Sequence, residues 1–438
     1  MKHKVKLGVV CLGRTTFDYK AAEEIYTNMQ IELLKRDDIE WAFAEELVIE
    51  VEDAKKAAVE LLKHNIDGFV CISGTFHLGH LVLEINKILN KPILLWGLNE
   101  LPYNGGKIRL NSVCGVNLNA SNLYKSGIRN YHVTIGEDID EEWVDAVRIK
   151  SCLQNAHVGI LGYRAHGFFN LSVYDLNAYK ELGILIDHYE ISDVLNNDVD
   201  KELLKTYRSK VKETFDCSGI SDEQAEKVAL LTAKYKKFLT DNKLDAIAVR
   251  CWPESARDFG ISPCAALSIL QSEGHIMACE GDFEGAISML SHKAIGGETP
   301  YLFDFSQVNF EDDYALLWHC GVAPCNLWDK KCVRSLDTYF AGGKGVTADF
   351  VLKSGDISIF RMDSAGTDVR LFLQEAKVIP MEKDLRGTYA KAIFNEPVKN
   401  ILEKVVYTGV AHHASLVYGK YIKPFEILAK INNWEVIK

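Results

Sequence analysis

The sequence predicts an α/β protein with two tandem αβα parallel-sheet domains followed by a β-rich C-terminal domain. Over roughly the first 300 residues, short apolar runs alternate with amphipathic segments, which is the pattern of parallel strands covered by helices on both faces. Beyond residue 301, long helical segments become scarce, and extended segments follow one another between turn residues. The length of 438 residues corresponds to about three domains of ~150 residues each. We therefore expect domains at residues 1–155, 156–300 and 301–438.

The predicted elements follow from the period of the apolar residues in each segment. In the first domain we expect strands at residues 6–12, 67–73 and 92–96 and helices at 19–36 and 80–89. In the second we expect strands at 157–162, 183–188, 245–251 and 275–279, with two polar helices at 201–215 and 223–242. In the third we expect strands at 301–305, 314–319, 346–352, 356–362 and 368–378, and helices only near the end, at 397–404 and 424–432.

Composition excludes several classes of function. The net charge of −11 argues against a surface that binds nucleic acid or an anionic membrane. No run of about 18 uncharged apolar residues is present, so we expect no membrane span. The apolar start is too short and too polar for a signal peptide. The 11 cysteines include no C-x-x-C pair, which is typical of reduced thiols in a cytoplasmic protein.

Polar residues that directly follow apolar strands are the first candidates for a site, because ligands of open α/β sheets bind beyond the carboxyl ends of the strands. Arg250, Trp252 and Glu254 follow one predicted strand, and Glu280 and Asp282 follow another. Their arrangement predicts a cleft at this edge of the second domain.

Asp304 is a carboxylate within an apolar strand, between Phe303 and Phe305. Its burial would cost several kcal/mol unless a cation or hydrogen-bond donors meet it. The alternative is an aspartate that faces solvent at the edge of a sheet.

Three histidines near apolar strands are candidate metal ligands. His412 and His413 are adjacent, so on a strand their side chains would point to opposite faces and only one would enter a given site. His319 ends another predicted strand. A single histidine at such a position more often has a structural hydrogen bond than a metal. Carboxylates with one imidazole would suit Mn²⁺ or Mg²⁺.

These strand-end residues resemble the L-fucose isomerase/L-arabinose isomerase family. The resemblance is carried by Cys251-Trp252-Pro253-Glu254, Cys279-Glu280-Gly281-Asp282, Asp304, Trp318-His319-Cys320-Gly321 and His412-His413. It extends over most of the chain, although the N-terminal part matches chiefly in pattern. The sulfoquinovose isomerases form a branch that resembles the same family.

The resemblance implies a metal-dependent aldose–ketose isomerase, usually with Mn²⁺, that assembles as a homo-oligomer, commonly a hexamer. It implies that Glu280, Asp304 and His413 bind the metal. Arabinose isomerases add a histidine roughly where His319 stands, and they have glutamate in place of Asp304. The implied substrate is a sugar of the fucose or arabinose type, with the conversion of sulfoquinovose to sulfofructose as the alternative.

The residues suit this chemistry independently of the family. Moving a carbonyl between C1 and C2 requires the removal and return of protons through an enediol, and Glu280 and Asp304 could serve as the base and the acid. A divalent ion would polarise the carbonyl and stabilise the enediolate.

The supporting roles are more open. Trp252, Arg14, Arg250, Arg164 and His319 are candidates for contacts with the substrate. An anionic sugar would need one of the arginines, or a lysine, near its sulfonate.

Two other functions remain open at this stage. Tandem αβα units with a cleft also describe non-catalytic sugar-binding proteins, although isolated acids at strand ends argue against that reading. In a metal-dependent hydrolase, His412, His413 and His319 would hold the ion, but the sequence has no H-x-H or H-x-x-H set beside the acids.

Overall fold

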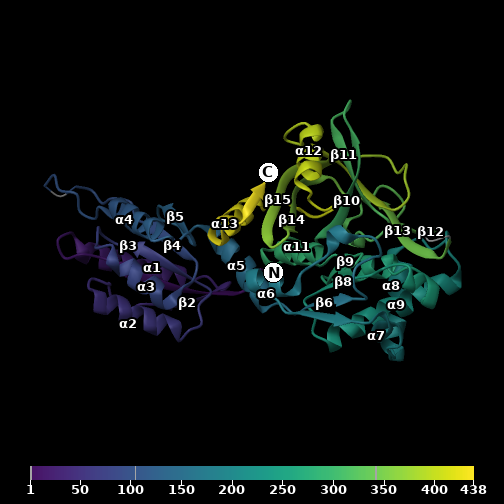
Figure 1. The fold of residues 1–438 in the computed structure, drawn as a ribbon, viewed down its shortest axis with the longest axis horizontal. Coiled ribbons are helices and arrows are strands. Elements are labelled where there is room, and N and C mark those ends of the chain that lie inside the picture. Colours follow the sequence, from purple (N-terminus) through teal and green to yellow (C-terminus); the bar gives the residue numbers. More distant parts are fainter. Residues whose placement is uncertain (1, 104, 341–342) are drawn as a thin grey trace. The chain divides into compact units, whose positions relative to one another are not determined.

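The structure is a computed structural model that describes residues 2–103, 105–340 and 343–438. It confirms the predicted fold class, with two parallel α/β sheets followed by a large, mainly antiparallel sheet (Figure 1). By compactness the described chain divides into two units. The N-terminal unit comprises residues 2–151 and 423–434, and the second unit comprises residues 152–422 and 435–438. The three domain boundaries expected from sequence stay a prediction, because compactness groups the second and third domains together.

The N-terminal unit contains a parallel sheet with the strand order β2-β1-β3-β4-β5. Its strands are β1 (Val5–Leu12), β2 (Ile39–Phe43), β3 (Gly68–Ser73), β4 (Ile93–Gly97) and β5 (Tyr131–Ile135). Its helices are α1 (Tyr19–Leu33), α2 (Val51–Leu62), α3 (His80–Leu89), α4 (Ser112–Lys125), most of α5 (Glu141–Asn155), and α13 (Ile422–Asn432) from near the chain end. The strands β1, β3 and β4 are almost wholly buried, which is why they were recognisable as apolar runs.

Two strands of this unit lack that signal. β2 and β5 are the edge strands, and β5 has no fully buried residue. Edge strands are covered on fewer sides and therefore need fewer apolar residues, so their sequences did not indicate strands.

The second unit begins with a parallel sheet in the order β7-β6-β8-β9. Its strands are β6 (Val158–Leu161), β7 (Ile186–Tyr189), β8 (Ala246–Val249) and β9 (Ile276–Cys279). Its helices are α6 (Asp175–Leu182), α7 (Ile191–Leu195), α8 (Lys201–Thr214), α9 (Asp222–Asp241), α10 (Cys264–Ser272) and α11 (Phe283–Ala294), with short helical turns η1 (Phe169–Leu171) and η2 (Ser255–Phe259). The order places β8 and β9 side by side, so residues that follow the two strands meet at one edge.

The remainder of the second unit is a sheet in the order β12-β13-β16-β11-β10-β17-β14-β15-β18. Its strands are β10 (Tyr301–Asn309), β11 (Tyr314–His319), β12 (Ser335–Phe340), β13 (Gly345–Val351), β14 (Gly355–Ala365), β15 (Asp368–Ile379), β16 (Thr388–Phe394), β17 (His413–Tyr418) and β18 (Glu435–Ile437), with the turn η3 (Cys325–Leu327) and helix α12 (Val398–Thr408). A further pairing of β15 with β16 joins β16, β11, β10, β17, β14 and β15 into a closed antiparallel sheet. Closure was not predicted, because it depends on pairing between strands that are distant in sequence.

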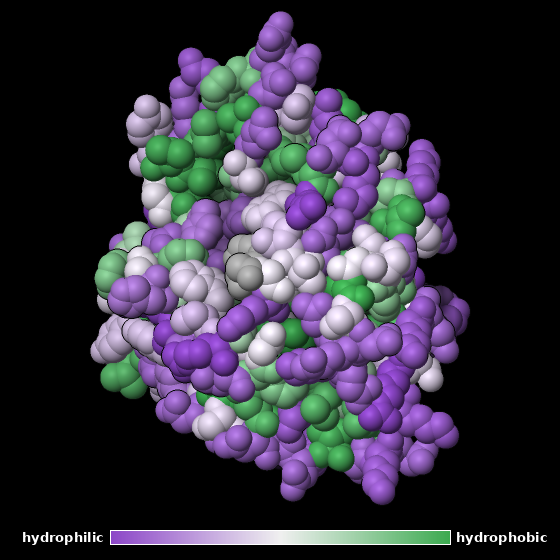
Figure 2. Space-filling view, turned by 90° about the vertical axis from the view of Figure 1, so that its right-hand side faces the viewer, coloured by the Kyte–Doolittle hydropathy of each residue, from purple (hydrophilic) through white to green (hydrophobic). Residues whose placement is uncertain are grey.

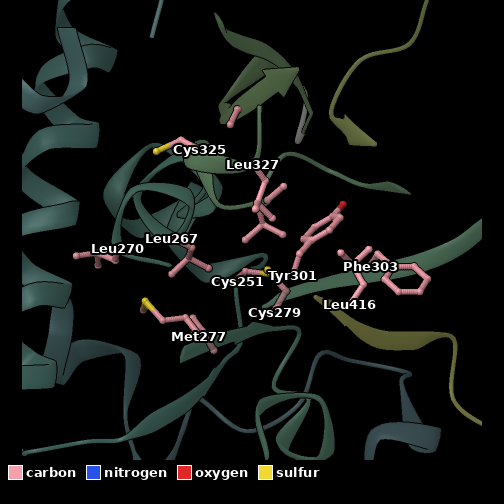
Figure 3. Close-up of a cluster of buried hydrophobic side chains, with 14 of the residues drawn as sticks. Cys251, Leu267, Leu270, Met277, Cys279, Tyr301, Phe303, Cys325, Leu327 and Leu416 are labelled. Carbon is pink, nitrogen blue, oxygen red and sulfur yellow. The ribbon is translucent and has the colours of Figure 1, made fainter. Parts of the chain in front are cut away.

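One large hydrophobic core of the second unit includes side chains from both of its sheets. It contains side chains of the parallel sheet, such as Cys251 and Cys279, together with Tyr301 and Leu416 from the closed sheet. Figure 3 shows that Cys251, Cys279 and Tyr301 lie together within this core. The shared core fixes the carboxyl ends of β8 and β9 against β10, and this contact positions the site described below.

Polar residues predominate on the face of the molecule shown in Figure 2, where apolar residues form separate patches. Among the described residues, no helix has the length and apolar character that a membrane crossing requires.

Candidate active site

The first side chain of the site, Glu280, follows β9 directly and sits in a strained turn. Its backbone has a φ of +63°, and Gly281 has a φ of +71°. A Cβ atom on Gly281 would lie 2.2 Å from the Tyr163 carbonyl oxygen, so only glycine fits there. A non-glycine residue in the left-handed region costs about 1–2 kcal/mol, and such strain is common where a functional side chain must be aimed.

Three neighbouring strands of the closed sheet supply the other groups. Asp304 of β10 lies opposite His413 of β17 and opposite Trp318 of β11. Directly opposed residues of antiparallel strands share a face, so Asp304 and His413 meet, and His319 at the end of β11 is nearby. Asp304 and His413 are over 100 residues apart in sequence, but they are adjacent because β10 and β17 are neighbours in the sheet.

The structure brings Glu280, Asp304 and His413 together at short range. The Nε2 atom of His413 is 3.2 Å from Glu280 Oε2 and 3.2 Å from Asp304 Oδ1. Within the described part of the chain, however, neither His413 Nε2 nor Asp304 Oδ1 has a partner with hydrogen-bond geometry. His413 Nε2 thus lies close to both carboxylates without a hydrogen bond to either.

This arrangement fits a divalent cation. Potential ligand atoms of Glu280, His412 and His413 lie within 4.8 Å of one another, as do those of Asp304, His319 and His413. Neighbouring ligands of an octahedral ion at ~2.1 Å are about 3 Å apart, which is close to the observed separations. Two carboxylates and one imidazole are a donor set for Mn²⁺ or Mg²⁺ rather than for a thiolate-binding metal.

His412 also lies beside Glu280, contrary to the expected alternation of adjacent side chains. Its Nε2 atom is 3.8 Å from Glu280 Oε2, and the ring centroids of His412 and His413 are 4.2 Å apart. The reason is that β17 begins at His413, so strand alternation does not include His412. Its Nδ1 atom is 3.2 Å from the Asn170 side-chain amide, and its ring packs edge-on against Phe168.

His319 has a defined tautomer. The Cys320 backbone N–H donates to His319 Nδ1 at 2.9 Å. Burial lowers the pKa of His319, so the ring is neutral and its single proton is on Nε2. The Nε2–H group is buried and has no partner among the described residues. His319 is therefore arranged to donate a hydrogen bond, whereas a metal ligand would need a lone pair on Nε2.

The charges of the site depend on one another. Burial disfavours the charged form of Glu280, but contacts with His412 and His413 outweigh it and hold the pKa of Glu280 well below its usual value. The pKa of Asp304 is also lowered, because His319 and His413 outweigh its burial. Burial disfavours a proton on His413, but Asp282, Asp304 and Glu280 raise the pKa of its ring well above normal. The acids are ionised, and the field that favours a proton on His413 also favours a metal ion beside it.

A cavity of about 600 Å³ adjoins these groups. Glu280, Asp304 and His319 line it, together with Trp252, Trp318, Arg257, Lys344, Cys251, Pro253, Ala256, Ser262, Cys264 and Cys320. This volume lies within the usual range of small-molecule pockets, about 300–1,000 Å³. Trp252 contributes both a wall and an N–H that donates to Glu280 Oε1 at 3.3 Å, so it also orients that carboxylate.

Two of the arginines proposed from sequence as substrate contacts interact with residues outside the cavity lining. Arg250 pairs with Glu254 at 2.7 Å, and Arg164 donates to Ser172 at 2.9 Å and stacks over Phe169. Neither is among the residues that line the cavity.

Arg14 belongs to the N-terminal unit, where its backbone N–H donates to Thr75 Oγ1 at 2.9 Å. Its role in substrate binding stays a prediction.

Sequence reasoning missed two kinds of residue. Arg257, in the helical turn η2, and Lys344, in an irregular segment, are cations that line the cavity, but neither belongs to a recognisable motif. Arg361 is fully buried behind the site and pairs with Asp282 at 2.7 Å. Its position within an apolar strand, with Ile359 and Phe360 before it, was the one available signal, because an arginine in such a run requires a buried acid.

Comparisons with known proteins support the family resemblance predicted from the sequence. The sequence profile described as "Fucose/sulfoquinovose isomerase, N-terminal domain" matches residues 8–149. The sulfoquinovose isomerases of Priestia aryabhattai and Priestia megaterium are each 26% identical in an alignment of 437 residues that covers 97% of this chain and 97% of those proteins. The sulfoquinovose isomerase of Alkalicoccus urumqiensis is 24% identical over 85% of this chain and 86% of its own length.

Similarity to solved structures adds nothing to the assignment. A carbohydrate transporter protein from Acidothermus cellulolyticus in complex with myo-inositol aligns over 68% of this chain and 89% of its own, with 11% identity and a TM-score of 0.19. That score is too low to carry an argument. The profile and the full-length relatives support the predicted resemblance to the fucose/sulfoquinovose isomerase family, and the relatives identify the chain as an aldose–ketose isomerase.

Proposed function

We propose that the chain is a divalent-metal-dependent isomerase that converts the sulfonated aldose sulfoquinovose into the ketose sulfofructose. The relatives named sulfoquinovose isomerase, which match 97% of the chain, support this substrate over a neutral sugar of the fucose or arabinose type. The observation that carries the proposal is the convergence of Glu280, Asp304 and His413 beside a cavity of about 600 Å³.

In this proposal Glu280, Asp304 and His413 hold the cation. When bound, a divalent ion would polarise the substrate carbonyl and stabilise the negative charge of the enediolate. Glu280 and Asp304 are both ionised and both line the cavity, so either can accept the proton from C2. The carboxyl group formed in this way is the acid that can return a proton to C1, which yields the ketose.

His319 supplies a hydrogen bond in the proposed mechanism. Its Nε2–H faces the site without a partner among the described residues, and its Nδ1 atom is occupied by the Cys320 backbone N–H. A fixed, buried donor of this kind suits the substrate oxygen on which charge develops. Trp252 holds Glu280 in place and presents its ring to the cavity.

Two cations are available for the sulfonate group. Arg257 lines the cavity, but it forms a bidentate pair with Asp258 at 2.6 and 2.7 Å. Lys344 also lines the cavity, and the structure gives it no ion pair with an acidic residue of the described ranges. We therefore propose Lys344 as the main sulfonate contact.

Three earlier expectations remain proposals of this account. The ion is Mn²⁺ by preference, since its site is made of carboxylates and imidazole. The assembly is a homo-oligomer, proposed as a hexamer from the family resemblance. The location is cytoplasmic, which the 11 free cysteines support.

The test is a screen of sulfoquinovose, L-fucose, D-arabinose and L-arabinose with the purified protein, with and without added Mn²⁺. Ketose formation is followed by NMR in D₂O, which also records deuterium at C1 or C2. We expect ketose only from sulfoquinovose, with deuterium incorporated next to the new carbonyl. Ketose from a neutral sugar alone would refute the proposed substrate, and binding without any turnover or exchange would refute the proposed reaction.

A further inference from the structure

The carboxylate of Asp282 is completely buried directly behind the site. Asp282 stands at the start of α11, where its Oδ1 atom accepts from the Gly285 backbone N–H at 2.8 Å and caps the helix. Its Oδ2 atom lies 2.8 Å from Nδ1 of His413. Asp282 does not line the cavity and so does not touch the substrate.

Among the described residues, every group that hydrogen-bonds to the Asp282 carboxylate is a donor. Besides Gly285 and His413, the Arg361 guanidinium donates to Oδ2 at 2.7 Å and to Oδ1 at 3.3 Å. A carboxylate offers only acceptor sites, so it satisfies all of these groups, whereas an amide would direct its NH₂ group at one of them. The surroundings thus require a carboxylate, and they require the proton of His413 to be on Nδ1.

We infer that Asp282 is a positioning residue that holds His413 in the tautomer whose Nε2 lone pair faces the cation. This inference rests on the proposed metal site. A carboxylate that accepts from the distal N–H of a metal-binding histidine fixes the ring orientation and increases its basicity. Because Nδ1–H is bound to Asp282, Nε2 is left free to meet the point shared with Glu280 and Asp304.

Arg361 makes this arrangement rigid. It is fully buried, and its Nη1 atom donates both to Asp282 Oδ2 at 2.7 Å and to the His413 carbonyl oxygen at 3.2 Å. The same guanidinium therefore ties the carboxylate to the backbone of the histidine that it orients. With α11 capped by Asp282, the ring of His413 has no freedom to turn without breaking a buried hydrogen bond.

The experiment measures Mn²⁺ affinity by the EPR signal of free Mn²⁺, without substrate. Asp282→Asn keeps the size of the side chain but forces a donor toward Arg361 or His413, so we expect the dissociation constant to rise by ~10–100-fold. Glu284→Gln is the matched control. It changes another carboxylate on Arg361 into an amide, and Glu284 makes no contact with His413. Its affinity for Mn²⁺ should equal that of the unmodified protein.

A double-mutant cycle distinguishes positioning from general damage. If Asp282 acts through His413, Asp282→Asn should weaken binding little further in a His413→Gln background. Equal weakening in both backgrounds, unchanged binding by Asp282→Asn, or equal weakening by Glu284→Gln would each overturn the inference. If the unmodified protein binds no Mn²⁺, it is the proposed metal site that fails.

Should Asp282→Asn not fold, the tautomer is read directly in the unmodified protein. With ¹⁵N-labelled histidine and bound Mg²⁺, a diamagnetic ion, the His413 ring should carry its proton on Nδ1, with the signal assigned from its loss in His413→Gln. A proton on Nε2 would overturn the inference.

Discussion

Glu284 is a buried carboxyl group whose ionisation should destabilise the folded protein. It is 3.3 Å from Arg361, but that guanidinium is shared with Asp282 at 2.7 Å and Asp363 at 3.2 Å. Burial, together with the charges of Asp363 and Asp282, therefore outweighs Arg361 and raises the pKa of Glu284 from 4.5 to about 7. We predict that Glu284→Gln makes the protein less sensitive to rising pH.

The sign follows from proton linkage. The folded pKa is above the unfolded one, so the stability that this group contributes is present below pH 4.5 and is lost as pH rises through about 7. The difference of ~2.5 units at ~1.36 kcal/mol per unit amounts to about 3.4 kcal/mol of unfolding free energy lost by pH 8. The Glu284→Gln variant should not lose this unfolding free energy.

The assay is urea unfolding of the second unit, in the full chain, at pH 5 and pH 8. Between these conditions the unfolding free energy of the unmodified protein should fall by about 2.5 kcal/mol more than that of Glu284→Gln. All other titrating groups are common to both proteins and cancel in this comparison. Parallel changes in the two proteins would refute the reasoning, because they would mean that Glu284 is ionised in the fold without cost.

Further predictions concern the site itself. Glu280→Gln and Asp304→Asn should each lower kcat by ~10²–10⁴-fold or more, since each removes a proton-transfer group. Stopped assays with sulfoquinovose measure kcat, and an unchanged thermal unfolding temperature shows that each variant is folded. Near-normal turnover by either variant would exclude the two-carboxylate mechanism. His319→Phe should lower kcat by ~10²–10³-fold because it removes a hydrogen-bond donor to the developing oxyanion. Its affinity for Mn²⁺, measured by EPR, should stay unchanged. A large loss of Mn²⁺ affinity would instead make His319 a metal ligand. Lys344→Gln should raise KM for sulfoquinovose by about tenfold or more, as expected for the loss of one charge-assisted contact. The control Lys353→Gln should leave KM unchanged, because Lys353 stacks over Tyr418 outside the cavity lining. Equal effects of the two substitutions would remove Lys344 from the sulfonate site.

Much of the fold could be predicted because buried parallel strands are continuous apolar runs. The strands around Val70, Leu94, Ile247 and Ala278 are buried on both faces, and their sequences reflect it. Glu280 was found as a candidate for the same reason: it is the first polar residue after such a run. The edge strands β2 and β5 and the closure of the antiparallel sheet left no comparable signal, because they depend on which strands become neighbours.

The candidate metal-binding residues could be singled out from the sequence, but their surroundings could not. Asp304 stood out as a charge between aromatic residues, and the structure pairs it with His413 across two strands. The proton on Nε2 of His319 depends on a backbone N–H from Cys320, and the cavity position of Lys344 depends on tertiary packing. Neither is expressed in local sequence, so sequence alone could not distinguish a donor from a ligand or a sulfonate contact from a surface lysine.

The central claim is that Glu280, Asp304 and His413 hold one divalent cation beside the sugar cavity. Equilibrium dialysis of the purified chain with Mn²⁺, repeated with Glu280→Gln, Asp304→Asn and His413→Gln, tests it most directly. We predict one tightly bound ion per chain in the unmodified protein and a large loss of affinity in each variant. Undiminished binding in all three variants, or no binding by the unmodified chain, would contradict the account.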